Sequence, residues 1–159
     1  MPPDVAAFRS VMSHFATGVT VVTTWGENGP TGLTASAICS LSLDPLLMIV
    51  CLDNGSRTLA AVRRTRRLVV NVLAADQRAL AATFASKASE SEKFRGVAWH
   101  EVAGLPVLDG VVAWLGGEVR DLLPGGDHVI GVTAVEATGA AGGDPLIHHR
   151  GLYRSLASD

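Results

Sequence analysis

The pattern of apolar and polar residues predicts a domain built mainly of β-strands. Short β-branched or alternating runs are separated by turn residues such as Asn28-Gly29 and Asp44-Pro45. Two or three short helices do not alternate regularly with these runs, which argues against a Rossmann sheet. The pattern therefore favours a closed, mostly antiparallel barrel with helices packed outside. The strand runs cover residues 19–24, 31–40, 46–52, 68–73, 97–102, 111–122 and 128–138, and the helical ones 5–15, 56–66 and 74–86.

The first helical run has one apolar face. Asp4 can cap it, and Gly18 is expected to end it as a left-handed stop. The strand at 111–122 contains Gly116-Gly117, which indicates a bulge or a close approach of another backbone. The apolar face of the first helix consists of Val5, Phe8, Val11 or Met12, and Phe15.

The stretch from Gly32 to Thr58 is the most informative part of the chain. Its first strand uses small residues, Thr34-Ala35-Ser36-Ala37, where a strand built for packing would carry larger ones. Small side chains and hydroxyls let a flat ligand lie close to the backbone. Ser40 and Ser42 continue the pattern on one face of the extended chain. These positions are candidate ligand contacts.

The end of the same stretch is a candidate anion site. Asp53-Asn54-Gly55 forms a turn, and Ser56-Arg57-Thr58 opens a helix. A helix N-terminus offers unpaired N–H groups and a positive dipole end, and Arg57 adds a guanidinium. The alternative interpretation is that Asn54 or Ser56 is only an N-cap.

Several other polar residues allow two interpretations. Asn71 interrupts an apolar strand and must either bond neighbouring backbone or face a ligand. His128 is either a loop-end histidine or part of a site, and His100 is expected on the surface. The polar segment 86–93, followed by Phe94, is expected to be mobile and to gate a site. Four arginines, at positions 63, 64, 66 and 67, indicate favourable charge at a helix C-terminus, and contact with the 2′-phosphate of NADPH is an alternative.

Length and composition place limits on the class of protein. The 159 residues suffice for one domain, 1–159, and a net charge of −2 gives no case for nucleic acid. No apolar run is long enough to span a membrane, and the N-terminus has no secretory pattern, so a cytoplasmic protein is expected. Cys39 and Cys51 fit neither a disulfide framework nor a metal site and are expected to be buried thiols.

Common catalytic and metal motifs are missing from the sequence. It holds no dinucleotide fingerprint, P-loop or nucleophile elbow. His148 and His149 would point to opposite faces of a strand, so no metal ligand set is predicted. A triad of Ser36, His128 and Asp127 is not expected, because adjacent Asp127 and His128 cannot easily orient one another.

Taken together, several segments resemble the flavin reductase-like family, over about residues 8 to 154. The resemblance implies a fold that is mainly β with peripheral α-helices, a split β-barrel of the FMN-binding type. It further implies an NAD(P)H:flavin oxidoreductase that supplies reduced FMN or FAD to a separate monooxygenase, and a homodimer with the flavin near its interface. The segments are 18–23, 32–37, 40–45, 54–58, 71–73, Phe84 with Lys93-Phe94, 126–128 and 150–153.

The resemblance also implies roles for individual residues. Thr34, Ala35, Ser36 and Ala37 match the segment along the isoalloxazine, and Ser40 and Ser42 match positions towards the ribityl chain and phosphate. Asn54, Ser56, Arg57 and Thr58 match the phosphate end. Asn71 and Phe94 match positions beside the flavin. His128 matches a nicotinamide contact, and Tyr153 a residue that closes the pocket. The chain departs from the family at Asp44-Pro45-Leu46, where two prolines are common, and at His148, where an aromatic is common.

Hydride transfer between nicotinamide and flavin needs no acid or base from the protein, so no catalytic side chain is assigned. Donors near the flavin N1–C2=O edge, such as N–H groups around residues 34–37, would suffice. The choices between FMN and FAD and between NADH and NADPH stay open. A flavin-binding carrier, sensor or electron-transfer protein without reductase activity is the main alternative, and a deazaflavin-dependent enzyme or oxidase is a further one.

Overall fold

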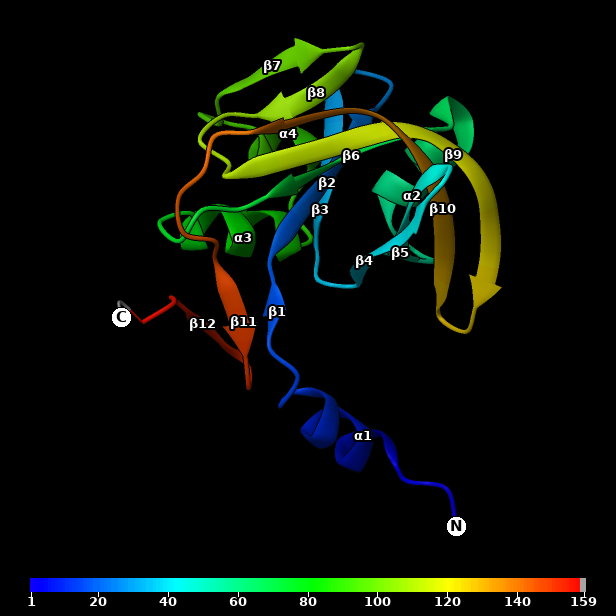
Figure 1. Cartoon of the computed structure of the whole chain (residues 1–159), viewed down its shortest axis with the longest axis vertical. Helices are drawn as coiled ribbons and strands as arrows, with labels where there is room; N and C mark the ends of the chain where they lie inside the picture. The colour runs from blue at the N-terminus through cyan, green and yellow to red at the C-terminus, as the bar shows by residue number, and fades with distance from the viewer. Residues whose placement is uncertain (158–159) are drawn as a thin grey trace.

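The computed structural model describes residues 1–157, which form four helices and twelve strands (Figure 1). The helices are α1 (Val5–Met12), α2 (Arg57–Thr65), α3 (Arg78–Ala85) and α4 (Glu90–Lys93). The strands are β1 (Thr17–Gly18), β2 (Thr20–Trp25), β3 (Pro30–Ala35), β4 (Ile38–Leu43), β5 (Leu46–Asp53), β6 (Arg67–Val72), β7 (Trp99–Val102), β8 (Leu105–Leu108), β9 (Ala113–Gly125), β10 (His128–Ala140), β11 (Ile147–His149) and β12 (Leu152–Arg154).

The main sheet has seven antiparallel strands in the order β3-β2-β6-β9-β10-β5-β4. Its two edge strands, β3 and β4, are consecutive in sequence and are joined only by Ser36 and Ala37. Two residues span a few ångströms, so the sheet must curl until its edges meet. No ladder joins β3 to β4 in the sheet that residues 1–157 form. The barrel is therefore split at this seam, and the closed barrel predicted from the strand pattern is wrong.

The core lies inside the curled sheet and beneath α2. Side chains from β2, β5, β6 and β9 meet there, and Leu59 and Val62 close it from the inner face of α2. The first half of β10 alternates as expected of a strand with one buried face, because Val129, Gly131 and Thr133 are buried and the residues between them are only partly buried. A second buried cluster around Phe84 packs α3 between β2 and the β8–β9 region.

The long ribbon of β9 and β10 has two register shifts. One lies opposite Gly116-Gly117, as the sequence predicted, and the other lies between Val132 and Thr133. A Cβ at Gly117 would stand 2.1 Å from the Ala134 carbonyl oxygen, so only glycine allows the two strands to approach this closely.

The N-terminal helix α1 projects away from the body of the molecule (Figure 1). Asp4 caps it, as predicted, and its Oδ1 accepts from the Ala7 N–H at 2.7 Å. None of its residues is buried. The helix ends at Met12, and Gly18 lies in β1, so the predicted glycine stop is wrong. The residues of the predicted apolar face are all at least half exposed, and Met12 is the least exposed of them at 50%.

The segment expected to be mobile forms the short helix α4. Ser89 and Glu92 make a full capping box, with Ser89 N–H donating to Glu92 Oε2 at 2.8 Å. Hydrogen bonding to Ser89 lowers the pKa of Glu92. None of the four helices is long and apolar enough to cross a membrane.

Candidate functional site

A cavity of about 650 Å³ opens at the N-terminus of α2. It brings together four residues that the sequence singled out, Thr34 from β3 and Ser56, Arg57 and Thr58 from α2. Its volume falls within the range of small-molecule and cofactor sites. We call it the α2 cavity; its other lining residues are Leu33, Asp53, Gly55, Phe84, Ala85, Ser86, Lys87, Glu90 and Lys93.

The N-terminus of α2 is both capped and open to an anion. Ser56 Oγ accepts from the Leu59 N–H at 3.0 Å, so the N-cap interpretation of Ser56 is correct. The first-turn N–H groups of Arg57 and Thr58 have no partner within an α-helix. They and the dipole end therefore still favour an anion in the cavity. The Thr58 side chain is buried, with its Oγ1 3.5 Å from that of Thr31.

Glu90 ties the walls of the α2 cavity together. Its Oε1 lies 3.0 Å from Arg57 Nε, and its Oε2 accepts from the Gly32 N–H at 3.0 Å. Arg57 Nη2 also donates to the Ala88 carbonyl. These bonds fix α4 against β3 and the start of α2.

Lys93 is a buried cation in the same wall. Its Nζ donates to the Gly32 carbonyl at 3.2 Å and lies 3.8 Å from Glu90 Oε1. Burial lowers the pKa of Lys93, and the Glu90 carboxylate partly opposes that effect. The cavity thus holds three basic side chains, Arg57, Lys87 and Lys93, against two carboxylates. This excess of positive charge suits an anionic ligand.

A second cavity, of about 700 Å³, lies at the seam of the barrel. Ser36 and Ala37 line it, so the chain from Thr34 to Ala37 runs from the α2 cavity to this one. The Thr17 hydroxyl there is buried without a partner in residues 1–157. We call it the seam cavity; its other lining residues are Met12, Phe15, Ala16, Gly18, Thr20, Ile38, Cys39, Ile49, Cys51 and Val72.

The two cysteines are not buried as predicted. Cys39 is exposed and Cys51 is half-buried, because both line the seam cavity rather than the core. Partial burial is the main cause that raises the pKa of the Cys51 thiol, and the nearby Cys39 thiol raises it further.

Six of the twelve predicted flavin contacts lie outside both cavities, and three of these are in β3 and β4. Ala35 is buried in the core, and Ser40 is exposed on β4. Ser42 Oγ accepts from the Asp44 N–H at 3.2 Å within the following turn. A register shift between Ser40 and Ser42 interrupts the regular alternation of β4, so the expected common face is not formed.

Asn54 holds the tip of the β9–β10 ribbon instead of facing the α2 cavity. Its Nδ2 donates to the Gly126 carbonyl at 3.1 Å, and its N–H donates to the Asp127 carbonyl at 3.0 Å. The side chain that was predicted as part of the phosphate cradle therefore fastens the loop before His128.

Asn71 is fully buried, and the protein itself supplies hydrogen-bond partners for its side-chain amide. Its Nδ2 donates to the Val21 carbonyl at 2.9 Å and to Thr23 Oγ1 at 3.0 Å. Its Oδ1 accepts from the Leu108 N–H at 2.9 Å. The amide is thus satisfied by the protein alone, which is the backbone alternative that the sequence left open.

The two predicted aromatic contacts pack against other rings. Phe94 makes an edge contact with Phe84, with centroids 4.9 Å apart, and does not line the α2 or the seam cavity. Tyr153 on β12 makes an edge contact with His148 on β11, with centroids 5.9 Å apart. Residue 148, where the chain departs from the family pattern, is therefore the neighbour of Tyr153.

His128 and Asp127 are hydrogen-bonded to each other despite being adjacent. His128 Nδ1 lies 2.8 Å from Asp127 Oδ1, which corrects the expectation that neighbours could not orient one another. That bond lowers the pKa of Asp127. Ser36 lines the seam cavity, which includes neither residue, so no triad forms. His100 is on the surface as predicted, with Nδ1 2.6 Å from Asp109 Oδ1.

The sequence analysis missed Lys87, Glu90 and Lys93 as site residues. One signal was their position in the polar segment that was expected to gate a site, and for Lys93 another was the Lys93-Phe94 pair in the family resemblance. Nothing in the local pattern distinguishes the buried Lys93 from a solvated lysine, because its burial results from the docking of α4 onto β3.

Comparison with known proteins identifies the family. The model of the flavin reductase like domain matches residues 12–157. The chain therefore belongs to the flavin reductase-like family, whose split-barrel fold it has.

Relatives and solved structures agree over nearly the full length. The reductase component of a 4-nitrophenol 4-monooxygenase/4-nitrocatechol 2-monooxygenase from Rhodococcus opacus is 41% identical over 152 residues, 96% of this chain and 81% of that protein. The flavin reductase PheA2 superposes with a TM-score of 0.90 at 32% identity, covering 98% of this chain and 100% of that one. The NADH:FAD oxidoreductase SgcE6 of Streptomyces globisporus, solved with NAD and FAD fragments, gives 0.92 at 31% identity, covering 100% and 96%.

Proposed function

We propose that this protein is an NADH-dependent flavin reductase that supplies reduced flavin to a separate monooxygenase component. The observation that carries the proposal is the α2 cavity, where a helix N-terminus and three basic side chains converge next to the seam. Relatives named as NADH-dependent flavin reductases and as reductase components support the same activity.

The cavities suggest how a flavin would lie. Its phosphate fits the α2 cavity, where the first-turn N–H groups, Arg57 and Lys87 would bind it. Its ring would follow the small residues from Thr34 to Ala37 to the seam cavity, whose lining is largely apolar. Side chains larger than Ser36 and Ala37 would block this path.

The protein's own contribution to the reaction is binding and orientation. A bound flavin accepts hydride at its ring, and the nicotinamide supplies it. Backbone N–H groups around Ser36 and Ala37 would stabilise the negative charge of the reduced ring. No residue in either cavity needs to act as an acid or base.

His128 is proposed to contact the nicotinamide nucleotide. The hydrogen bond to Asp127 uses Nδ1 of His128, so Nε2 is the ring nitrogen that would contact the nucleotide. Asn54 holds the tip of the β9–β10 ribbon next to His128. With FMN as the flavin, His128→Ala should raise the apparent KM for NADH about tenfold while the FMN Kd stays within about twofold. Unchanged NADH kinetics would remove His128 from the site. Tyr153 remains a proposal for the rim of the pocket.

A homodimer is also part of the proposal. Phe8, Val11 and Phe15 are each 60–71% exposed. Leu43 on the edge strand β4 is 84% exposed. A short helix with an uncovered apolar face is unstable alone in water. A second copy that covers α1, β4 and the seam cavity would enclose that cavity and complete the flavin site.

Light scattering tests the dimer. The native chain should elute at twice the chain mass of 16.5 kDa, and Phe8→Asp with Phe15→Asp should elute at the chain mass. A native monomer would refute this part of the proposal. The two free cysteines, one of them exposed, suit a reducing compartment, so a cytoplasmic location is proposed as well.

The activity is tested by anaerobic absorbance of flavin on addition of NADH or NADPH. Catalytic bleaching is expected. Binding without bleaching would favour a flavin carrier or sensor.

The phosphate site is tested by Arg57→Ala. Loss of a charge-assisted hydrogen bond, about 1.5–3 kcal/mol, should weaken FMN about 10- to 100-fold. Riboflavin, which lacks the phosphate, should bind as before. Arg63→Ala is the matched control, because Arg63 is exposed on the same helix and lines none of the cavities described. Equal losses for FMN and riboflavin would contradict the placement of the phosphate.

A further inference from the structure

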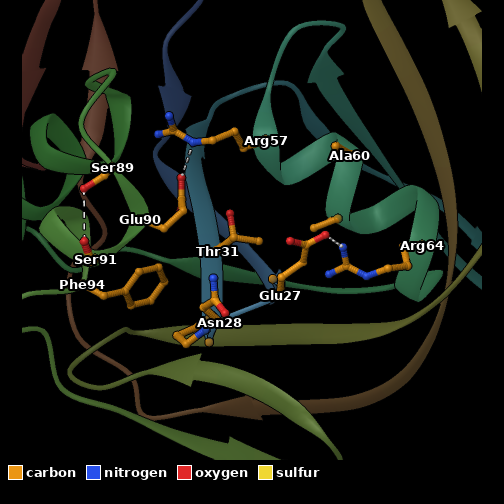
Figure 2. A pocket seen from close by; sticks show the side chains of 14 residues that line it. Glu27, Asn28, Thr31, Arg57, Ala60, Arg64, Ser89, Glu90, Ser91 and Phe94 are labelled. Carbon is orange, nitrogen blue, oxygen red and sulfur yellow. Dashed lines mark hydrogen bonds and ion pairs between the residues drawn. The ribbon is translucent and has the colours of Figure 1, made fainter.

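A third cavity, of about 570 Å³, lies between the β2–β3 hairpin turn, α2 and α4 (Figure 2). Arg57, Ala60 and Arg64 project from α2 on one side, and Ser89, Glu90, Ser91 and Phe94 lie on the other. Glu27 and Asn28 of the turn close a further side, and Thr31 lies at the back. We call this the hairpin cavity.

The hairpin cavity adjoins the α2 cavity. Arg57 and Glu90 line both, so their ion pair forms a shared wall. A group bound to the phosphate in the α2 cavity would therefore pass Arg57 to enter the hairpin cavity.

The two cavities differ in charge. The α2 cavity has an excess of basic side chains, whereas the hairpin cavity has two, Arg57 and Arg64, against Glu27 and Glu90. Arg64 is already engaged, since its Nη2 donates to the Trp25 carbonyl at 3.0 Å and its Nη1 lies 3.8 Å from Glu27. A balanced cavity of this kind suits an uncharged group rather than a second free anion.

The remaining lining suits a flat heterocycle attached to a sugar. Phe94 offers an aromatic ring, and Pro30, Ala60 and Ala61 offer apolar surface. Ser89, Ser91 and Asn28 supply polar groups at the mouth, where all three are exposed. The α2 side of the cavity includes two small residues, Ala60 and Ala61.

We propose that the hairpin cavity binds the adenosine of an adenylate group, and that its source is FAD. This inference rests on the proposed function. FAD is FMN extended by adenylate, and its pyrophosphate would lie beside Arg57 at the shared wall, so that only the uncharged adenosine enters the hairpin cavity. The adenylate of NADH has the same chemistry, but continuity with the flavin-phosphate cavity favours FAD. The native protein should therefore prefer FAD to FMN.

The test fills the hairpin cavity without touching the α2 cavity. Ala60 is exposed on α2 and lines only the hairpin cavity, so Ala60→Leu adds bulk there and keeps a good helix former. Ala82→Leu is the matched control on α3, exposed and outside all three cavities. Dissociation constants for FAD, FMN and AMP are measured by titration, and FMN binding also shows that each variant is folded.

We expect the native protein and Ala82→Leu to bind FAD at least tenfold more tightly than FMN. In Ala60→Leu, FAD should weaken at least tenfold, to near the FMN value, while FMN changes less than twofold. AMP should compete with FAD but not with FMN.

Three outcomes would overturn the inference. FAD and FMN could bind the native protein equally, or Ala60→Leu could leave their ratio unchanged. With FMN as the flavin, Ala60→Leu could raise the KM for NADH tenfold, which would assign the cavity to the nicotinamide nucleotide. Each of these leaves the reductase proposal intact. Failure of both flavins to bind the native protein would instead refute the proposed function itself.

Discussion

Replacing Asn71 by leucine distinguishes a structural amide from a flavin contact. The two side chains are close in size, so the change removes hydrogen bonds with little change in volume. Asn71 is 0% exposed and makes three hydrogen bonds, two as donor and one as acceptor from the Leu108 N–H. The amide holds β6 to β2 and β8 at the centre of the fold.

The cost follows from these bonds. Leaving the Leu108 N–H buried without a partner costs about 1–3 kcal/mol, and each lost donor bond about 0.5–1.5 kcal/mol. The leucine methyls recover part of this by apolar burial, so we expect a loss of about 2–5 kcal/mol in the free energy of unfolding. That is a large fraction of the total stability of a typical domain.

Urea unfolding measures the effect. With a slope of about 2 kcal/mol per M, the urea midpoint should fall by about 1–2.5 M. Asn28→Ala, in the exposed hairpin turn, should stay within about 0.5 kcal/mol of the native protein. The FMN Kd of folded Asn71→Leu should change less than twofold. An unchanged midpoint with a tenfold weaker FMN affinity would refute the reasoning and return Asn71 to the flavin site.

Two further predictions concern packing and pH. Gly117→Ala should lower the unfolding free energy by about 1–3 kcal/mol or more, because the new Cβ would stand 2.1 Å from the Ala134 carbonyl oxygen. Thermal melting measures the effect. Gly18→Ala is the control and should change the melting temperature little, because a Cβ at Gly18 has no atom within 4 Å. Burial lowers the pKa of Lys93 in the native protein. Between that lowered pKa and the ordinary lysine value of about 10.4, the unfolded chain therefore binds more protons than the native protein does. The native protein should therefore gain stability relative to Lys93→Met as pH rises towards the ordinary lysine pKa of about 10.4. Urea midpoints of the two proteins that stay parallel up to that pH would contradict the lowered pKa.

The local elements followed from the sequence because their causes are local. Ser56 precedes a run with helical spacing, and the α2 helix begins there. Gly116-Gly117 predicted the irregularity that the β9–β10 register shows. The small residues Thr34 to Ala37 marked the part of the chain that joins the two cavities. In each case the conformational preference of a few neighbouring residues was enough.

The tertiary structure decided which polar residues meet. Asn71 and Asn54 have the same side chain, yet one satisfies the core and the other fastens the β9–β10 tip. Lys93 became a buried cation only because α4 docks through Glu90 onto β3 and α2. The split of the barrel depends on how far the sheet curls before β3 and β4 meet. These outcomes depend on contacts between segments far apart in sequence, which a local pattern of apolar and polar residues cannot encode.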